Sequence, residues 1–467
     1  MKRSSYLLKN LGLLTISNFA SKILVFLLVP LYTSVLSTAD YGTYDLTVST
    51  VTLLYPLLTL NIVDAVMRYI MDKSHDNRKV VDIGNSFVCT SVIIFSIIIV
   101  VISSTGLWPA ISGFELLIWL YFVVYVFNQY FIQIAKGLEK VIDIGIGGVL
   151  ATVSLLGSNL LFLLVFKWGL KGFFIANCLS LGVPNLFYFI RLNAWKYIRR
   201  TAHIDPSLCK EMLIYCVPLI ATTLGWWVNS TADKYTVTFI CGIAANGLLS
   251  VSYKIPQILG TLQTIFTQAW QISAIKEYGE KGTAVFYGKT FNTINILICA
   301  VCSWLILLTK PLALILYQKD FYTAWRYVPF LIISCVLNSA SGFLGPILSA
   351  KKASKPMAMS AVYGASANVV MNILFVYLIG IQGATIATVI SSFIIYWVRK
   401  RAVGDEIKIV GYEIVLFTWV LLCIQAILEI YTSLWWAELI LMAVMLVFNL
   451  RVIKDLLQMG KTMIKRK

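Results

Sequence analysis

Charged residues lie inside segments of this chain that are otherwise long and apolar enough to cross a bilayer. They are five basic and three acidic side chains: Lys22, Arg68, Lys234, Lys254 and Lys289, with Asp45, Asp64 and Asp233. A charge at the bilayer centre costs about 2.5–3.5 kcal/mol, so it normally faces a bundle interior or a watery cavity. Because this set is net positive, it predicts a site inside the membrane for an anionic solute.

The composition predicts that membrane helices position these residues. Mean hydropathy is +0.84, hydrophobic residues make up 59% of the chain, and charged residues make up 13%. About 20 apolar residues in a helix span the hydrocarbon core. Fourteen segments qualify, roughly 11–36, 43–70, 83–106, 114–135, 146–166, 171–190, 213–240, 246–274, 285–308, 327–350, 357–379, 383–398, 411–430 and 434–450. Segment 383–398 is short, so twelve or thirteen spans remain an alternative, and no soluble domain is left over.

The distribution of basic residues predicts the topology. If the N-terminus is cytoplasmic, the inward segments carry 28 of the 38 Lys and Arg residues, and the outward loops carry 5. This asymmetry predicts that both termini are cytoplasmic. The net charge of +17 is spread over eight short segments, so it indicates membrane topology rather than a nucleic-acid surface.

Three short matches show that the two halves of the chain resemble each other at an offset of about 204–211 residues. The longest aligns Gly169-Leu170-Lys171-Gly172 with Gly380-Ile381-Gln382-Gly383. Six spans separate equivalent segments, which predicts parallel repeats with a solute site between two lobes. We therefore expect an all-α membrane protein of about 14 helices: a six-helix lobe over 1–198, a second over 199–400, and a helix pair with a basic tail over 401–467.

The segment 246–274 carries a regular polar pattern. Residues three or four apart share one face of a helix, and the pattern consists of Lys254, Gln257, Thr261, Thr264, Gln268 and Gln271. In a membrane, such a face points toward water or protein. It either lines a cavity, with Gln257 and Gln268 contacting solute, or supplies hydrogen bonds between helices.

Other polar residues extend the predicted site. Asn18 and Lys22 share a helix face, and Lys22 and Lys254, which have no obvious partner on their own helices, are the main candidates for solute contact. Asp64 and Arg68 are four residues apart, so a structural ion pair is an alternative to a site role. Asp233 has the same alternative with a neighbouring lysine, such as Lys234.

Three further features predict the shape of a helix or the position of side chains in the bilayer. Pro56 predicts a kink in the second span. Lys289, near a helix start, is expected to extend to the interface. Trp226, Trp227 and Trp270 either stack on sugar rings or anchor the helices at the interface.

No enzymatic motif is found in the sequence. It has no Walker A sequence, no metal-ligand cluster and no outward loop long enough for a catalytic domain. We therefore expect no catalysis, no metal site and no cofactor.

Several short motifs resemble a known family. They are Ser17-Asn18-Phe19-Ala20-Ser21-Lys22, Val29-Pro30-Leu31-Tyr32, Asp40-Tyr41-Gly42-Thr43-Tyr44 and Ala65-x-x-Arg68-Tyr69. They resemble Wzx-type polysaccharide flippases of the MOP superfamily, which also contains MurJ lipid flippases and MATE exporters.

The resemblance implies alternating access that moves an undecaprenyl-diphosphate-linked oligosaccharide, for O-antigen, capsule or a similar polymer, across the bacterial inner membrane. It places Lys22 and Arg68 in a cationic cavity. Polysaccharide-assembly proteins and membrane lipids are the implied partners. Burial of Asp45, Asp64 and Asp233 suggests coupling to H⁺ or Na⁺.

Alternative functions remain open. A MATE-like cation antiporter should have an acidic site, whereas this interior has five bases and three acids. A MurJ-like lipid II flippase is favoured by the fourteen-span layout. A membrane-bound glycan enzyme would need a large outward loop with catalytic carboxylates.

Overall fold

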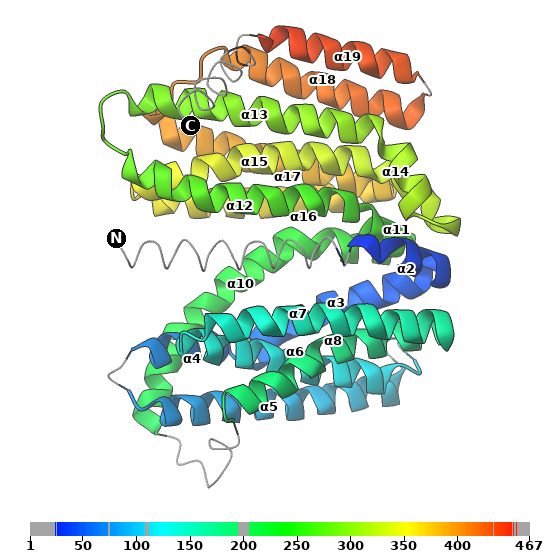
Figure 1. Ribbon diagram of the computed structural model, residues 1–467, viewed down its shortest axis with the longest axis vertical. Helices are drawn as coiled ribbons and strands as arrows, with labels where there is room; N and C mark the ends of the chain where they lie inside the picture. The colour runs from blue at the N-terminus through cyan, green and yellow to red at the C-terminus, as the bar shows by residue number, and fades with distance from the viewer. Residues whose placement is uncertain are drawn as a thin grey trace. The chain divides into compact units, whose positions relative to one another are not determined.

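The computed structural model describes residues 24, 26–72, 75–106, 108, 112–194, 205–432, 434–450, 452 and 454. This part of the chain is helical, without strands (Figure 1). The elements are α2 (Val29–Val35), α3 (Thr38–Leu58), α4 (Ile62–Met71), α5 (Asn77–Thr105), α6 (Glu115–Gly137), α7 (Val141–Asn159), η2 (Leu160–Val165), α8 (Gly169–Arg191), α10 (Pro206–Cys241), α11 (Ile243–Ser252), α12 (Lys254–Lys276), α13 (Thr283–Leu307), α14 (Thr309–Leu316), η3 (Lys319–Tyr327), α15 (Val328–Ala350), α16 (Ser354–Ile379), α17 (Ile381–Val403), η4 (Gly404–Glu406), α18 (Tyr412–Tyr431) and α19 (Trp435–Phe448).

The membrane-protein prediction is confirmed. Among the described residues, ten helices are long and apolar enough to span a bilayer, and the bent pair α3–α4 makes eleven. Two more helices match predicted spans: α19, with 14 residues, and α12, whose polar side chains lower its hydropathy. The short predicted segment 383–398 is the 23-residue helix α17. Most of the first predicted span lies outside the described residues.

The predicted kink in the second span is present, but it lies just beyond Pro56. Helix α3 continues through Pro56 to Leu58, and α4 begins at Ile62 with a bend of 59° between the two helices. Leu60 and Asn61 adopt left-handed φ values of 48° and 54°. The Asn61 amide donates to the Pro56 carbonyl at 2.9 Å and closes the turn.

Two compact units divide the chain at Thr231 and Ala232, within α10. In the first unit, α4 has a sharply divided surface: Ile62, Val63 and Val66 are fully buried, while Arg68 is exposed. Helix α4 packs on α5 and α6, and α8 packs on α6 and α7. The apolar face of α4 therefore fixes its orientation within this unit.

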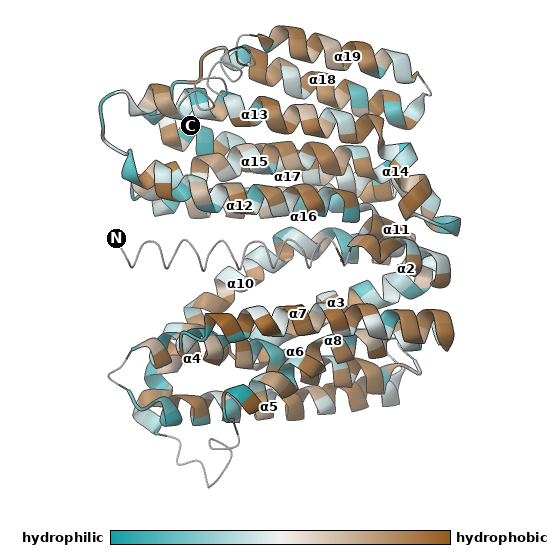
Figure 2. Cartoon of the chain, in the orientation of Figure 1, coloured by the Kyte–Doolittle hydropathy of each residue, from teal (hydrophilic) through white to brown (hydrophobic). Residues whose placement is uncertain are grey.

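In the second unit, α15 is the central helix. It packs against α12, α13, α17 and α18, and 83% of the most apolar part of its span is buried. A helix that is hydrophobic all round belongs in a core. The pair α18–α19, mainly brown in Figure 2, packs on α13. The predicted lobe boundaries at 198/199 and 400/401 stay predictions.

Repeated glycines occupy equivalent positions in the two units. Gly169, the first residue of α8, and Gly380, immediately before α17, both have positive φ, of 55° and 64°. Gly172 and Gly383, three residues later, both contact the preceding helical segment closely. A Cβ on Gly383 would approach the Phe375 carbonyl oxygen at 2.1 Å, and one on Gly172 would lie 3.0 Å from the Phe162 Cβ. The sequence match therefore corresponds to the same tight helix–turn–helix packing.

Candidate functional site

In the first unit, neutral amides hold the carboxylate of Asp64. Asn61 Nδ2 donates to Asp64 Oδ2 at 2.9 Å, and Gln133 Nε2 from α6 donates to Oδ1 at 2.7 Å. The left-handed turn at Asn61 places its side chain over the first turn of α4. Gln133 Oε1 is buried without a hydrogen-bond partner in the described part of the chain. Asp64 thus belongs to a half-buried polar cluster that joins α4 to α6.

The alternative ion pair between Asp64 and Arg68 is not formed. No ion pair joins these two residues, both of which the structure describes. Arg68 lies in the last turn of α4 with an exposed side chain. The adjacent Tyr69 turns the other way and donates to Glu211 Oε1 in α10 at 3.1 Å. Arg68 therefore keeps its guanidinium on a surface not covered by the first unit.

The remaining predicted residues of the first half are less informative. Asp45 is half-buried on α3. Asn18 and Lys22 lie outside the described residues, so their place in the site stays a prediction.

In the second unit, a tyrosine holds the carboxylate of Asp233. The Tyr253 hydroxyl donates to Asp233 Oδ2 at 2.5 Å, and the Lys234 amide donates to Oδ1 at 2.9 Å. Asp233 is buried in α10, and Tyr253 stands at the junction of α11 and α12. The sequence pattern did not identify Tyr253, because it directly precedes Lys254 and is not one of the regularly spaced polar residues of α12.

The lysines of the second unit differ in position. Lys234 and Lys254 are half-buried, and Lys254 begins α12 directly after Tyr253. Asp233, Tyr253 and Lys254 therefore lie in one region, because Tyr253 hydrogen-bonds to Asp233 and directly precedes Lys254. Lys289 is exposed and is the seventh residue of α13.

The polar face of α12 is largely uncovered within the second unit. Gln257, Thr264, Gln268 and Gln271 are exposed, while Ile255, Leu259 and Trp270 are buried on the opposite face. Thr261 and Thr264 bond only to carbonyls of α12 itself. The amide that bonds to a neighbouring helix is Gln263, which donates to the Cys335 carbonyl of α15 at 2.9 Å. Gln263, which is not part of the predicted polar face, therefore links α12 to α15.

The tryptophans also separate by position. Trp270 is buried and donates to the Phe343 carbonyl at 2.9 Å, so it belongs to the core of the second unit. Trp227 donates to the Ser49 carbonyl at 3.0 Å within the first unit. Trp226 is 62% exposed.

A cavity of about 450 Å³ in the first unit lies apart from the predicted residues. Its lining comes from α5, α6 and α8 and includes Phe127, Tyr130, Asn185 and Phe189. Most of this surface is apolar. No charged residue in the described part of the chain lines this cavity, so it lies outside the candidate site.

Each unit thus contains an aspartate that accepts hydrogen bonds from uncharged donors: the half-buried Asp64 from Asn61 and Gln133, and the buried Asp233 from Tyr253. Lysine and glutamine side chains near these aspartates or on uncovered helix faces can donate to phosphate oxygens and sugar hydroxyls.

The sequence matches a known family over more than half of its length. Residues 7–271 match the family model described as "Polysaccharide biosynthesis protein". No curated protein matches the sequence.

Solved structures with a similar fold are transporters. Lipid II flippase MurJ in an inward closed conformation is 14% identical, with a TM-score of 0.68, and the match covers 95% of this chain and 99% of MurJ. An inward-facing multidrug resistance MATE transporter of the MOP superfamily is 16% identical, with a TM-score of 0.60 and coverage of 84% and 95%.

A third is a MOP superfamily transporter from Pyrococcus furiosus, described as having a binding pocket of reverse polarity. It is 15% identical, with a TM-score of 0.51 and coverage of 85% and 96%. At these identities, the likeness to all three shows the fold alone.

Proposed function

We propose, from the premise that the chain belongs to the polysaccharide biosynthesis protein family and has a MurJ- and MATE-like transporter fold, that it is a lipid-linked oligosaccharide flippase. It moves an undecaprenyl-diphosphate-linked repeat unit from the cytoplasmic to the outer leaflet of the bacterial inner membrane by alternating access. The protein is a multi-pass membrane protein, and we place both termini in the cytoplasm.

The uncovered polar face of α12 is the observation that carries this proposal. A helix surface with Gln257, Gln268 and Gln271 exposed to lipid would leave three amides without partners in hydrocarbon, at a cost of several kcal/mol each. The face must therefore meet water, another part of the protein or a polar solute. An oligosaccharide offers the hydroxyl groups that primary amides bind.

Cationic residues supply the second requirement of this substrate. A diphosphate leaving the aqueous phase needs donors that replace its hydration, and lysine is a compact phosphate-binding charge. Lys254 stands at one end of the polar face of α12. We assign diphosphate binding to Lys254, Lys22 and Arg68, and we propose that Lys234 and Asn18 also line the transport path. A positive site is the opposite of what an organic cation requires.

Ion coupling is assigned to the aspartates. Asp233 is buried and held by Tyr253, and Asp64 is held by Asn61 and Gln133. We propose that Asp233, Asp64 or Asp45 binds the H⁺ or Na⁺ that drives the cycle. The function is transport without catalysis, and its partners are the lipid-linked saccharide, membrane lipids and polysaccharide-assembly proteins.

The experiment that tests this function is deletion of the gene, followed by analysis of undecaprenyl-linked saccharides. Accumulation of the completed repeat unit at the cytoplasmic leaflet, reversed by the wild-type gene, supports the proposal. Unchanged lipid-linked pools together with altered drug tolerance would contradict it and favour a MATE-like exporter. Accumulation of lipid II instead would favour a MurJ-like substrate.

A further inference from the structure

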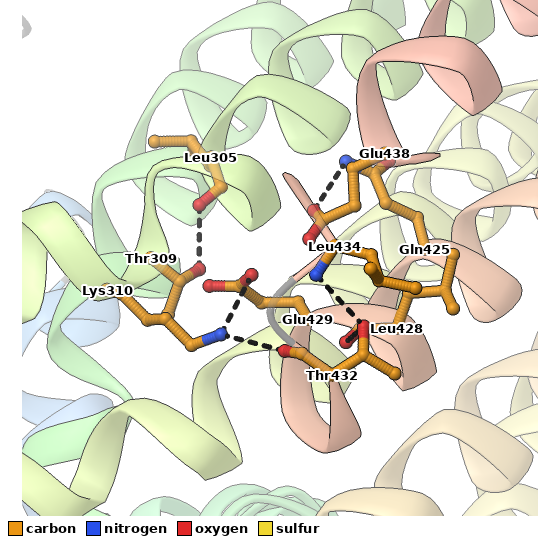
Figure 3. Close-up of polar contacts among 9 residues, drawn as sticks. All are labelled: Leu305, Thr309, Lys310, Gln425, Leu428, Glu429, Thr432, Leu434 and Glu438. Atoms are coloured by element: carbon orange, nitrogen blue, oxygen red, sulfur yellow. Dashed lines mark hydrogen bonds and ion pairs between the residues drawn. The ribbon is translucent and has the colours of Figure 1, made fainter. Parts of the chain in front are cut away.

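The C-terminal helix pair contains a buried polar cluster outside the predicted transport site. Glu429 in the last turn of α18 is 4% exposed, and Glu438 in the first turn of α19 is 1% exposed. Lys310 from α14 donates to Glu429 Oε2 at 3.4 Å and to the Thr432 carbonyl at 3.2 Å (Figure 3). Two buried carboxyl groups thus lie beside the ammonium of Lys310, a side chain that is itself 29% exposed.

The neutral members of the cluster fix the position of Glu438. Gln425 Nε2 donates to Glu438 Oε2 at 3.4 Å and to the Ser303 carbonyl at 3.0 Å, while Ser303 donates to Gln425 Oε1 at 2.7 Å. Gln425 and Ser303 are also buried. Ser303 of α13 therefore fixes the side-chain amide of Gln425. This amide in turn hydrogen-bonds to the Glu438 carboxyl group.

The charge of the cluster is unbalanced if both carboxyl groups are ionised. The charged groups that act on Glu429 are Lys310 from α14 and Glu438 from α19. Helix α15, which also packs on α18, carries no charged side chain. Two carboxylates and one ammonium leave one net negative charge in a buried site, where an uncompensated charge is costly.

One acceptor in the cluster lacks a donor. Glu429 Oε1 is buried and has no hydrogen-bond partner in the part of the chain that the structure describes. The Glu438 carboxyl group lies beside Glu429, yet two ionised carboxylates have only acceptors to offer each other. A single proton supplies the missing donor and also removes the excess charge.

We propose that Glu429 and Glu438 form a proton-binding site that holds one proton between two carboxyl groups, with Lys310 balancing the remaining charge. The helix dipoles indicate where the proton resides. Glu429 lies at the C-terminal end of α18, where a negative charge is unfavourable, whereas Glu438 lies at the N-terminal end of α19, where it is favourable. The proton is therefore held mainly on Glu429. A metal ion fits less well, because it needs several oxygen ligands and the described part of the cluster leaves one open acceptor.

Infrared spectroscopy of the full-length protein in lipid nanodiscs tests this site. At neutral pH, the wild-type protein should show the C=O stretch of a protonated carboxyl group, shifted in D₂O. Glu429→Gln and Glu438→Gln should each remove it, because one carboxylate then balances Lys310. The matched control is Glu413→Gln, an exposed glutamate at the start of the same α18 helix, which should retain the band.

A second variant keeps the test decisive if either glutamine variant fails to fold. Lys310→Gln removes the balancing charge, so the band should increase as both carboxyl groups become protonated. An unchanged band in Lys310→Gln, or an equal band in wild type and both glutamate variants, would overturn the proposal. A change of the wild-type band on replacing choline chloride with sodium chloride would also overturn it, in favour of a metal cation. This readout does not require transport, so its failure is separable from failure of the proposed flippase function.

Discussion

Tyr253 donates a hydrogen bond to Asp233, and this contact joins α10 to the junction between α11 and α12 in the second unit. It connects a buried carboxylate to the residue immediately before Lys254. A change in the ionic state of Asp233 is therefore positioned to affect the start of the polar face of α12. This contact gives the predicted coupling residue and the predicted substrate residue a physical connection.

We expect Tyr253→Phe to destabilise the protein and to uncouple transport from the driving ion. The substitution removes a donor from a buried carboxylate, which costs about 1–3 kcal/mol. The measurement is the thermal unfolding midpoint in detergent, followed by transport with and without an imposed ion gradient. Tyr377→Phe, at a tyrosine that is 76% exposed, is the matched control. Equal stability and equal gradient dependence in both variants would show that the contact has no role.

Gln268→Leu should reduce transport without reducing stability, because Gln268 is exposed on the polar face of α12. Gln263→Leu provides the contrast on the same helix. It removes the hydrogen bond to the Cys335 carbonyl, so we expect a lower unfolding midpoint, corresponding to about 0.5–1.5 kcal/mol. Surface polysaccharide per folded protein and the unfolding midpoint are measured for both. If Gln268→Leu transports normally, the polar face does not line the transport path.

Lys254→Ala should reduce glycan export by at least about tenfold while leaving the protein inserted in the membrane. A hydrogen bond from a charged donor contributes about 1.5–3 kcal/mol, and 1.4 kcal/mol corresponds to a factor of ten. We expect Lys22→Ala to behave in the same way. Lys289→Ala, at an exposed lysine on α13, is the control. Normal export by Lys22→Ala and Lys254→Ala would remove both residues from the site.

Gly383→Ala should destabilise the packing of α17 against α16. The added Cβ would overlap the Phe375 carbonyl oxygen, and overpacking of this kind costs about 1–3 kcal/mol. Gly225→Ala, on α10 with open space around the position, should be neutral or stabilising. The free energy of unfolding, compared with that of the wild type, measures both effects. If Gly383→Ala and the wild type have the same free energy of unfolding, α16 and α17 can move apart to accommodate the Cβ without loss of stability.

Sequence patterns predicted the helices well because hydropathy is a local property. The segments 114–135 and 411–430 correspond closely to α6 and α18. Spacing along one helix also identified the exposed face of α12. Contacts between distant segments were not predictable in this way. Asp64 binds Gln133, 69 residues away, instead of its helical neighbour Arg68.

The cluster around Glu429 was missed for the same reason. Lys310 lies between the predicted segments 285–308 and 327–350, and its carboxylate partner lies 119 residues further along the chain. The predicted segments contained the glutamates, but nothing in their spacing indicated that they would meet one lysine. These side-chain contacts depend on how α14, α18 and α19 pack against one another, which hydropathy does not determine.

Reconstitution of the purified protein into liposomes that contain an undecaprenyl-diphosphate-linked oligosaccharide is the most direct test of the proposed function. The measured quantity is the fraction of saccharide that an impermeant lectin or glycosidase reaches over time. Our account predicts that the wild-type protein moves the initially protected saccharide into the accessible leaflet and that Lys254→Ala does not. Movement of organic cations without any movement of the lipid-linked saccharide would contradict it.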